Sequence, residues 1–362
     1  MADAPSTEMD DGPGEQAMND MGHRWKRRPA GSTWGDFGDA DQIGRMNLLT
    51  PAIRKAAAAE IIEGRAFTLS LPLDYPGGSV LSANRKPPEL RAGRLPGGGA
   101  NYGFHASCIS DGYTDVFNDD AVLLHTQYST QWDALSHYGC EFDADDDGVE
   151  EVVYYNGYAH DTAIRDATEC DGGIGAVSLG IENLAMAGVQ GRGVLIDLKA
   201  VYGDRRHGVG YDDLMTIMAA QNVEVGRGDF LCLYTGFADI IMDMAGKPDG
   251  ARLKSACAVL DGGDTRLLQW ISDSGIVAIC ADNFAVESPN LAHDAAPGGR
   301  RPVLPLHHHC LFKLGVHLGE LWLLRDLAAG LRQAGRNRFF LTAPPLRLTG
   351  SVGSPVSPVA TI

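Results

Sequence analysis

The sequence lacks the signatures of several large protein classes. Its 362 residues contain no GxSxG motif, no Walker motif, and no run that approaches the ~18 apolar residues of a membrane span. Gly173-Ile174-Gly175 lacks the third glycine of a dinucleotide-binding fingerprint. These absences argue against an α/β-hydrolase, a P-loop NTPase, a Rossmann-type dehydrogenase and a membrane-spanning protein.

Cysteine and basic residues are also scarce. The seven cysteines are odd in number and far apart, so they predict neither a disulfide framework nor a CxxC site. Thirty Lys and Arg against 47 Asp and Glu give a net charge of −17, which disfavours nucleic acid and anionic membranes as partners. The first thirty residues contain no apolar leader. We therefore expect a cytoplasmic protein that acts on a small molecule.

The composition, with 44% hydrophobic and 21% charged residues, is typical of a globular protein. Residues 1–30 are predicted to form a flexible N-terminal arm, and residues 31–362 a single domain. Predicted helices cover 51–63, 178–190, 211–222, 264–274 and 317–333. Predicted strands cover 66–73, 194–198, 230–234, 276–281 and 339–342. Their alternation indicates a mixed α/β fold.

Two Pro/Gly-rich stretches interrupt this pattern. Residues 87–103 are predicted to form a long loop, of the kind that often shapes an active site. Composition alone makes residues 342–362 a flexible tail.

The first polar cluster ends the run AVLLHTQYSTQW, residues 121–132, whose residues alternate with period two. As a strand it would place His125, Gln127, Ser129 and Gln131 on one face, and Asp133 would continue that face. His137 joins them if the chain turns into a helix after residue 132. A histidine beside an aspartate is more often a hydrogen-bonded core pair than a ligand, so this pattern alone does not establish a site.

The second cluster is His307-His308-His309, followed by Glu320 within an apolar segment. Burying three histidines is costly unless some of them have partners, and a metal is the partner they most often serve. A polar surface turn is the alternative.

Two acidic clusters are weaker candidates. Asp143 to Gly148 opens like an EF-hand loop, but Tyr154 stands where the loop needs a glutamate, which favours a solvated acidic turn over a looser calcium site. Asp282 and Glu287 follow an apolar strand. They could line a pocket, although capping and turn formation explain them equally well.

Several blocks resemble the cyclase family of metal-dependent hydrolases, which includes bacterial kynurenine formamidase and isatin hydrolase. In chain order they are WGDFGDADQIGRMNLLTP (34–51), STQWDALSH (129–137), YYNGY (154–158), GRGVLIDL (191–198), DFLCLYTGF (229–237), DNFAVE (282–287) and LTAPPLRLTGSVGSPVSPVA (341–360). The resemblance implies a central β-barrel-like mixed sheet flanked by helices, an ordered C-terminal segment, and a homodimer or homotetramer. It also implies Zn²⁺- or Mn²⁺-dependent hydrolysis of amide, formamide or cyclic imide bonds.

The family signature His-x-Gly-Thr-His-x-Asp-x-Pro-x-His can be laid on residues 127–137. Gln127 and Gln131 then replace its two leading histidines, and Thr130, Asp133 and His137 match. A second family element, a histidine with a glutamate twelve residues later, matches His308 and Glu320. The resemblance thus implies four catalytic and metal-binding residues: Asp133, His137, His308 and Glu320. Gln131 is a further candidate ligand, and the residues expected to contact the substrate or support the ligands are Gln127, Gln131, Thr130, His125 and Trp132.

The two glutamines weaken the expected metal site, because an amide oxygen binds cations less well than imidazole binds Zn²⁺. One outcome is Mn²⁺ or Mg²⁺ held by Asp133, Gln131 and Glu320. A second is a shifted site that uses His137, His308 and Glu320, and the third is no metal. His125 is a separate candidate to replace a missing imidazole, because it would share the strand face of Gln127. We favour the shifted site, with Zn²⁺ or Mn²⁺ ahead of Mg²⁺.

The sequence therefore predicts a hydrolase that opens a small-molecule amide, cyclic imide or lactone with metal-activated water. Two alternatives stay open. One is a metal-independent lyase, dehydratase or cyclising enzyme on the same scaffold, and the other is a non-catalytic small-molecule binding protein.

Overall fold

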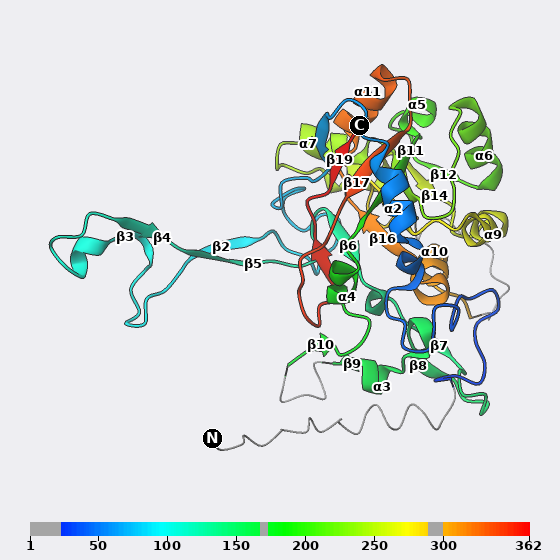
Figure 1. Cartoon of the computed structure of the whole chain (residues 1–362), viewed down its shortest axis with the longest axis horizontal. Coiled ribbons are helices and arrows are strands. Elements are labelled where there is room, and N and C mark those ends of the chain that lie inside the picture. Colours follow the sequence, from blue (N-terminus) through cyan, green and yellow to red (C-terminus); the bar gives the residue numbers. More distant parts are fainter. Residues whose placement is uncertain (1–22, 167–172, 289–299) are drawn as a thin grey trace, which may run out of the picture.

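The structure, a computed structural model, describes residues 23–166, 173–288 and 300–362 (Figure 1). Nine strands form one curled sheet in the order β1-β19-β17-β11-β13-β15-β16-β6-β18. Strands β11, β13, β15 and β16 run parallel, and the other pairings are antiparallel. The strand bounds are β1 Ala66–Thr68, β6 Gln131–Asp133, β11 Gln190–Asp197, β13 Phe230–Tyr234, β15 Ala278–Ala281, β16 His317–Glu320, β17 Arg338–Thr342, β18 Gly353–Pro355 and β19 Val359–Thr361. The expected mixed fold around a β-barrel-like sheet is confirmed.

The other described strands form two-stranded pairs, and helices surround the sheet. The paired strands are β2 Glu89–Ala92 with β5 Asp120–Leu123, β3 Tyr102–His105 with β4 Val116–Asn118, β7 Cys140–Phe142 with β8 Glu151–Val153, β9 Ile164–Arg165 with β10 Gly175–Ala176, and β12 His207–Val209 with β14 Ala258–Leu260. The α-helices are α2 Pro51–Ala58, α3 His160–Ala163, α4 Ile181–Met186, α5 Lys199–Tyr202, α6 Tyr211–Ala220, α7 Phe237–Asp243, α8 Gly250–Ser255, α9 Thr265–Ser274, α10 Pro305–His307 and α11 Arg325–Gln333. Short 3₁₀ turns are η1 Gly44–Leu48, η2 Ala106–Cys108, η3 Leu135–His137 and η4 Tyr155–Gly157, and η5 His308–Leu314 is a π-helix. Every helix in these ranges is too short or too polar to span a bilayer.

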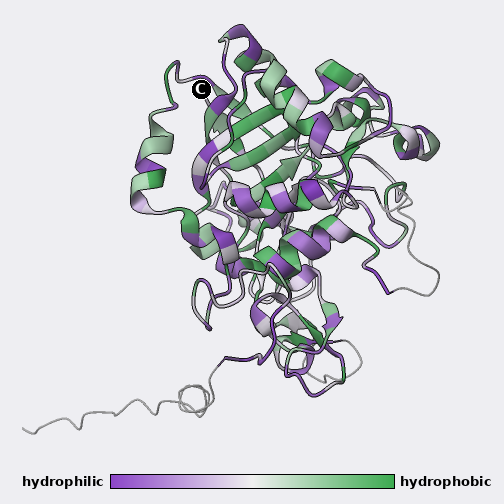
Figure 2. Ribbon diagram, turned by 90° about the vertical axis from the view of Figure 1, so that its right-hand side faces the viewer, coloured by the Kyte–Doolittle hydropathy of each residue, from purple (hydrophilic) through white to green (hydrophobic). Residues whose placement is uncertain are grey.

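The two faces of the central sheet pack into separate cores, because successive side chains of a strand point to opposite sides. On β13, Leu231 and Leu233 belong to a core shared with α6, α9 and η5. Phe230 and Cys232 belong to the other core, with Trp132, Trp322 and α11. The strands at the centre are accordingly hydrophobic along most of their length (Figure 2). This explains why the parallel strands read as continuous apolar runs in the sequence.

Most predicted elements of the second half are confirmed with shifted ends. β13 has its predicted bounds, α6 and α9 lie within two residues of theirs, and β11, β15 and β17 contain most of their predicted residues. The predicted helix at 317–333 is wrong at its start, because residues 317–320 form the buried strand β16 and only 325–333 are helical. A short apolar run fits a buried strand as well as a helix, and here the sheet decides.

At both ends of the chain, the structure differs from the one predicted from composition. Residues 353–361 form β18 and β19, so the ordered C-terminus implied by the resemblance is confirmed and the flexible tail is wrong. The predicted strand at 66–73 is regular only over 66–68. Of the N-terminal segment predicted to be flexible, residues 1–30, residues 1–22 lie outside the described residues. Trp25 is buried beside Trp34, which places the remainder of that segment on the body.

The predicted loop at 87–103 is wrong, because residues 87–123 form a projecting two-stranded arm, called the arm below (Figure 1). β2 pairs with β5, and β3 pairs with β4. Their partners lie many residues later in the chain, so no local pattern shows the pairing. The arm exposes large apolar side chains: Leu90, Tyr102, Ile109, Tyr113, Val116, Phe117, Val122 and Leu123.

Two glycines bring η1 against the end of η5. Gly44 has φ 54° and Gly315 has φ 60°, both in the left-handed region. A Cβ on Gly44 would lie 2.2 Å from the Gly315 carbonyl oxygen, and the Arg45 amide donates to that oxygen at 2.8 Å. The contact holds in place the helical segment that follows His307.

We expect Gly44→Ala to lower the free energy of unfolding by roughly 3 kcal/mol or more, since it adds a backbone clash to left-handed strain. Gly31→Ala is the matched control, because Gly31 has φ 71° and a Cβ added there would meet nothing within 4 Å. That variant should lose only about 1 kcal/mol. Urea unfolding measures both, and equal losses would contradict a tight glycine contact.

Candidate active site and metal centre

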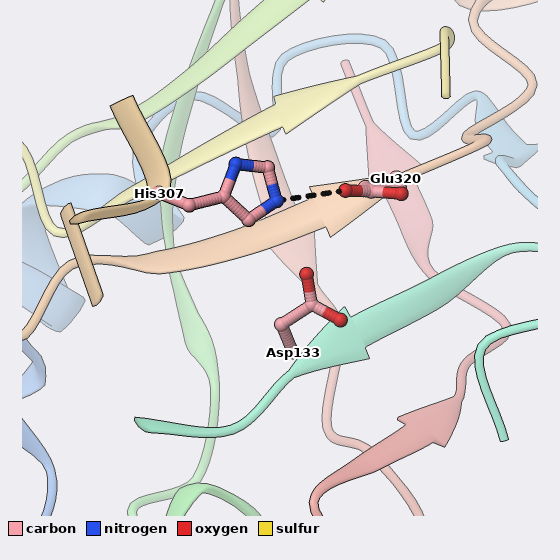
Figure 3. Close-up of side chains that lie close together, drawn as sticks. All are labelled: Asp133, His307 and Glu320. Carbon is pink, nitrogen blue, oxygen red and sulfur yellow. Dashed lines mark ion pairs between the residues drawn. The ribbon is translucent and has the colours of Figure 1, made fainter. Parts of the chain in front are cut away.

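Three buried side chains from separate elements converge beside the edge of the central sheet. Asp133 ends β6, Glu320 ends β16, and His307 ends α10. Antiparallel pairing places Gln131 opposite Glu320, and the period of two puts Gln131 and Asp133 on one face of β6. Figure 3 shows the three side chains turned toward one another. One potential ligand atom from each lies within 4.8 Å of the other two.

A pair of carboxylates fixes the His307 imidazole. Its Nδ1 lies 2.9 Å from Glu287 Oε1, and its Nε2 lies 3.5 Å from Glu320 Oε1. Glu287 also accepts hydrogen bonds from the backbone N–H groups of Leu306 and His307. Burial alone would lower the pKa of His307, but hydrogen bonds to Glu287 and Glu320 raise it to about 10. The ring is thereby held with Nε2 directed at the cluster.

The two carboxylates of the cluster differ in acidity. Burial and the charge of Glu320 raise the pKa of Asp133 above its ordinary value, although His137 acts in the opposite direction. Burial would also raise the pKa of Glu320, but its hydrogen bond to His307 and the charges of His307 and Arg85 lower it. Glu320 is therefore the carboxylate that stays ionised, and Asp133 is the one that binds a proton more readily.

Gln131 lies between these carboxylates. Its Nε2 donates to Asp133 Oδ1 and to Glu320 Oε2, each at 3.3 Å. Its Oε1 and the Asp133 Oδ2 are buried and have no hydrogen-bond partner among the described residues. The amide N–H groups thus occupy a position where two carboxylates need a positive partner.

The donor set fits a divalent cation. Two carboxylates and an imidazole whose other nitrogen faces a carboxylate form a common metal-binding arrangement, and the unpartnered Asp133 Oδ2 supplies a free oxygen. Gln131 could add a neutral oxygen ligand if its amide were reversed, which would direct Oε1 toward the cluster. Asp133, His307 and Glu320 are therefore the candidate ligands.

The structure brings His307, in place of the sequence-predicted His308, to Asp133 and Glu320. His308 is half-buried against Phe312, with ring centroids 4.9 Å apart, and burial lowers its pKa to about 4. Successive helical residues point about 100° apart, so one face of this segment presents only one of three adjacent histidines. A π-helix follows, and its turn is wider than that of an α-helix. The spacing of twelve residues before Glu320 therefore does not identify which histidine faces Glu320.

His137 lies at the rim of the cluster. It ends η3, and its Nε2 is 3.9 Å from Asp133 Oδ1, with 24% of the side chain exposed. The predicted turn after Trp132 is therefore present as 3₁₀ rather than α. A partly exposed imidazole beside buried carboxylates can exchange protons with solvent.

The residues predicted to contact the substrate or support the ligands fall into two groups. Thr130 and Trp132 hold the scaffold: the Thr130 hydroxyl accepts from Leu71 N–H, and Trp132 Nε1 donates to the Ala343 carbonyl. Gln127 and His125 belong to the irregular segment between β5, which ends at residue 123, and β6, which begins at residue 131. The Gln127 side-chain nitrogen lies beside Gly353, the register partner of Asp133. The single alternating strand predicted over 121–132 is wrong, and only Gln131 and Asp133 keep the predicted common face.

The acidic residues of the two weaker sequence clusters have different roles in the structure. Glu287, which sequence analysis could not separate from a turn residue, positions His307. Asp282 accepts from Thr235 N–H, the Thr235 hydroxyl and Gly236 N–H, which is a structural role. Asp143 accepts from the amides of Asp147 and Gly148, so the acidic segment does turn, but Asp143 is buried and pairs with Arg27 at 3.4 Å instead of being solvated. The oxygens of Asp143, Asp145 and Glu151 lie within 4.8 Å of one another.

The Cyclase family model matches residues 67–288. The chain belongs to the Cyclase family. A crystal structure of a novel cyclase is 31% identical, with a TM-score of 0.71, over 91% of this chain and 97% of that one. Isatin hydrolase A from Ralstonia solanacearum is 14% identical, with a TM-score of 0.52, over 86% of this chain and 98% of that one, and it shares the fold. No curated protein matched the sequence.

Membership of the Cyclase family confirms the resemblance on which the sequence prediction rested. The matched residues 67–288 contain Asp133, His137 and Glu287, whereas His307 and Glu320 lie C-terminal to them. The 91% coverage by the solved cyclase includes most of the chain.

We expect Gln131→His to strengthen Zn²⁺ binding at least tenfold, because imidazole is a better Zn²⁺ ligand than an amide. Asp133→Asn should weaken both Zn²⁺ and Mn²⁺ binding by a similar factor. Isothermal titration of full-length, EDTA-treated protein measures each affinity, and elemental analysis of untreated protein gives its native content. Gln190→His is the control, since Gln190 is exposed on β11. Identical affinities in all variants would rule out a metal site at this cluster.

Proposed function

We propose that this Cyclase family member is a hydrolase that opens a small-molecule amide, cyclic imide or lactone, with a divalent metal as its cofactor. The observation that carries the proposal is the convergence of Asp133, His307 and Glu320 in a buried cluster with His137 at its rim. The fold shared with isatin hydrolase A adds support. Zn²⁺ and Mn²⁺ suit this mixed nitrogen and oxygen donor set.

Each residue of the cluster has a different proposed role, which follows from its contacts. Glu287 orients the His307 imidazole, so that Nε2 faces Glu320 and Asp133. A bound divalent ion would polarise the substrate carbonyl and lower the pKa of a bound water toward 7. His137 accepts the proton of the attacking water at Nε2 and returns it to the leaving nitrogen or oxygen. Asp133, 3.9 Å away, stabilises the imidazolium that forms between these steps.

The metal-independent lyase or dehydratase is the second candidate, and one observation favours it. Gln131 Nε2 already bridges both cluster carboxylates, and the protonated form of His307 supplies a positive charge. Such a site offsets part of its negative charge without a cation. Asp133 and His137 would then carry acid–base chemistry on an activated substrate.

Hydrolysis is tested with isatin, an N-formylaniline, a cyclic imide and a lactone as substrates in H₂¹⁸O. We expect ¹⁸O in the product carboxylate, because only hydrolysis transfers solvent oxygen to carbon. His137→Ala and His307→Gln should each lower kcat/KM at least 100-fold, as expected for loss of a general acid–base group or of a metal ligand.

His308→Gln is the matched control, since it changes the adjacent histidine outside the cluster, and we expect its kcat/KM to stay within a few-fold of the unchanged protein. Turnover without ¹⁸O incorporation would favour the lyase or dehydratase. Turnover that survives His137→Ala and His307→Gln would contradict the assigned site.

We also propose a cytoplasmic homodimer or homotetramer that associates through the arm. An isolated two-stranded ribbon is marginally stable in water, and the arm exposes apolar side chains that a second copy would cover. The six cysteines in the described ranges are unpaired, which is consistent with a reducing compartment.

Replacing residues 89–123 with a short Gly-Ser linker should reduce the assembly to a monomer, because it removes the exposed apolar strands. Light scattering coupled to size-exclusion chromatography measures the mass. A milder variant, Phe117→Ser with Val122→Ser, keeps the length of the arm and should weaken association in the same direction. An unchanged mass in both variants would exclude the arm as the contact.

A further inference from the structure

An open cavity of about 440 Å³ lies where the two ends of the arm join the body. Arg85 precedes the arm, and residues 124–127 follow it. The paired strands β9 and β10 form another wall, and residues 350–352 close the cavity toward the central sheet. The arm therefore sets the position of the residues that line this cavity.

The cavity adjoins the candidate active site. Gly353, the residue after the lining residue Val352, pairs with Asp133 in the register of β18 and β6. The Val352 carbonyl accepts a hydrogen bond from Ala134 N–H at 3.1 Å. A molecule that fills the cavity would thus lie next to the strand that carries Asp133.

The lining is positively charged, although the chain carries a net charge of −17. Its titratable members are Arg85, Arg165 and His125, and no acidic residue is among the described residues that line it. Arg85 Nη1 donates to the Gln127 carbonyl at 2.8 Å, which anchors the guanidinium at the wall. Neither arginine forms an ion pair with an acidic residue of the described ranges. Two guanidinium groups with no carboxylate partner in the described part of the chain constitute an anion-binding lining.

The electrostatic effect of Arg85 extends into the cluster. Burial raises the pKa of Glu320, whereas the contact with His307 and the charge of Arg85 lower it. The apolar remainder of the lining, from Leu124, Ile164, Ile174 and Val352, suits the carbon skeleton of a small molecule. An anionic group and an apolar body would therefore both find a complement here.

We propose that Arg85 and Arg165 bind a carboxylate of the substrate and so restrict the enzyme to small amides, imides or lactones that carry such an acidic group. The inference rests on the proposed hydrolase function and names its substrate class. Arg85 is a specificity residue, because its guanidinium can pair with the carboxylate while the scissile carbonyl lies at Asp133, His307 and Glu320. Arg165, which is exposed, supplements it at the opposite wall.

Binding of benzoate and of its neutral isostere benzamide tests this without any turnover. Calorimetric titration of the full-length protein should show benzoate binding at least tenfold tighter than benzamide. Arg85→Gln should remove that preference, Arg165→Gln should reduce it by a smaller factor, and Arg85→Lys should restore part of it, since lysine keeps the charge but loses the bidentate fork.

Arg65→Gln is the control, because Arg65 is exposed and pairs with Glu63 away from the cavity. It should bind benzoate like the unchanged protein. Benzoate binding that survives Arg85→Gln, equal binding of benzoate and benzamide, or no binding of benzoate would each overturn the proposal. Equal binding of benzoate and benzamide by the unchanged protein would overturn this proposal and leave the ¹⁸O result untouched, so its failure and that of the hydrolase function are distinguishable.

Discussion

The buried contact of His307 with Glu287 and Glu320 is the interaction on which the centre of this protein depends. Charged groups inside a protein cost several kcal/mol each unless they are paired and hydrogen-bonded. Here one imidazole lies between two carboxylates, and Glu287 takes two further backbone hydrogen bonds. These contacts require the segments around residues 287, 307 and 320 to meet at one point.

The sheet and its connections satisfy that requirement. β15 leads toward Glu287, β16 ends at Glu320, and the antiparallel pairing of β6 with β16 adds Gln131 and Asp133. The π-helix and the Gly44–Gly315 contact fix the chain between His307 and β16. A site at the carboxyl end of a parallel strand is common in α/β folds, because side chains there project beyond the sheet.

Glutamines stand at two positions where the sequence resemblance led us to expect histidines. Gln131 lies between Asp133 and Glu320 and donates hydrogen bonds to both carboxylates. Gln127 lies in the irregular segment before β6 and lines the cavity, where Arg85 donates to its backbone carbonyl. Its side-chain nitrogen lies beside Gly353, the register partner of Asp133.

The sequence by itself predicted the mixed α/β class and pointed to Asp133, His137 and Glu320 as candidate site residues. Hydrophobic runs and a family motif are local features, so they can be recognised in the sequence without knowledge of the fold. Tertiary structure alone decided that His307 replaces His308, that Glu287 orients it, and that residues 87–123 form an arm whose ends present Arg85 to a cavity. Each of these depends on helix rotation or on pairing between distant segments. The local pattern does not encode such relations, because they arise only when the whole sheet has formed.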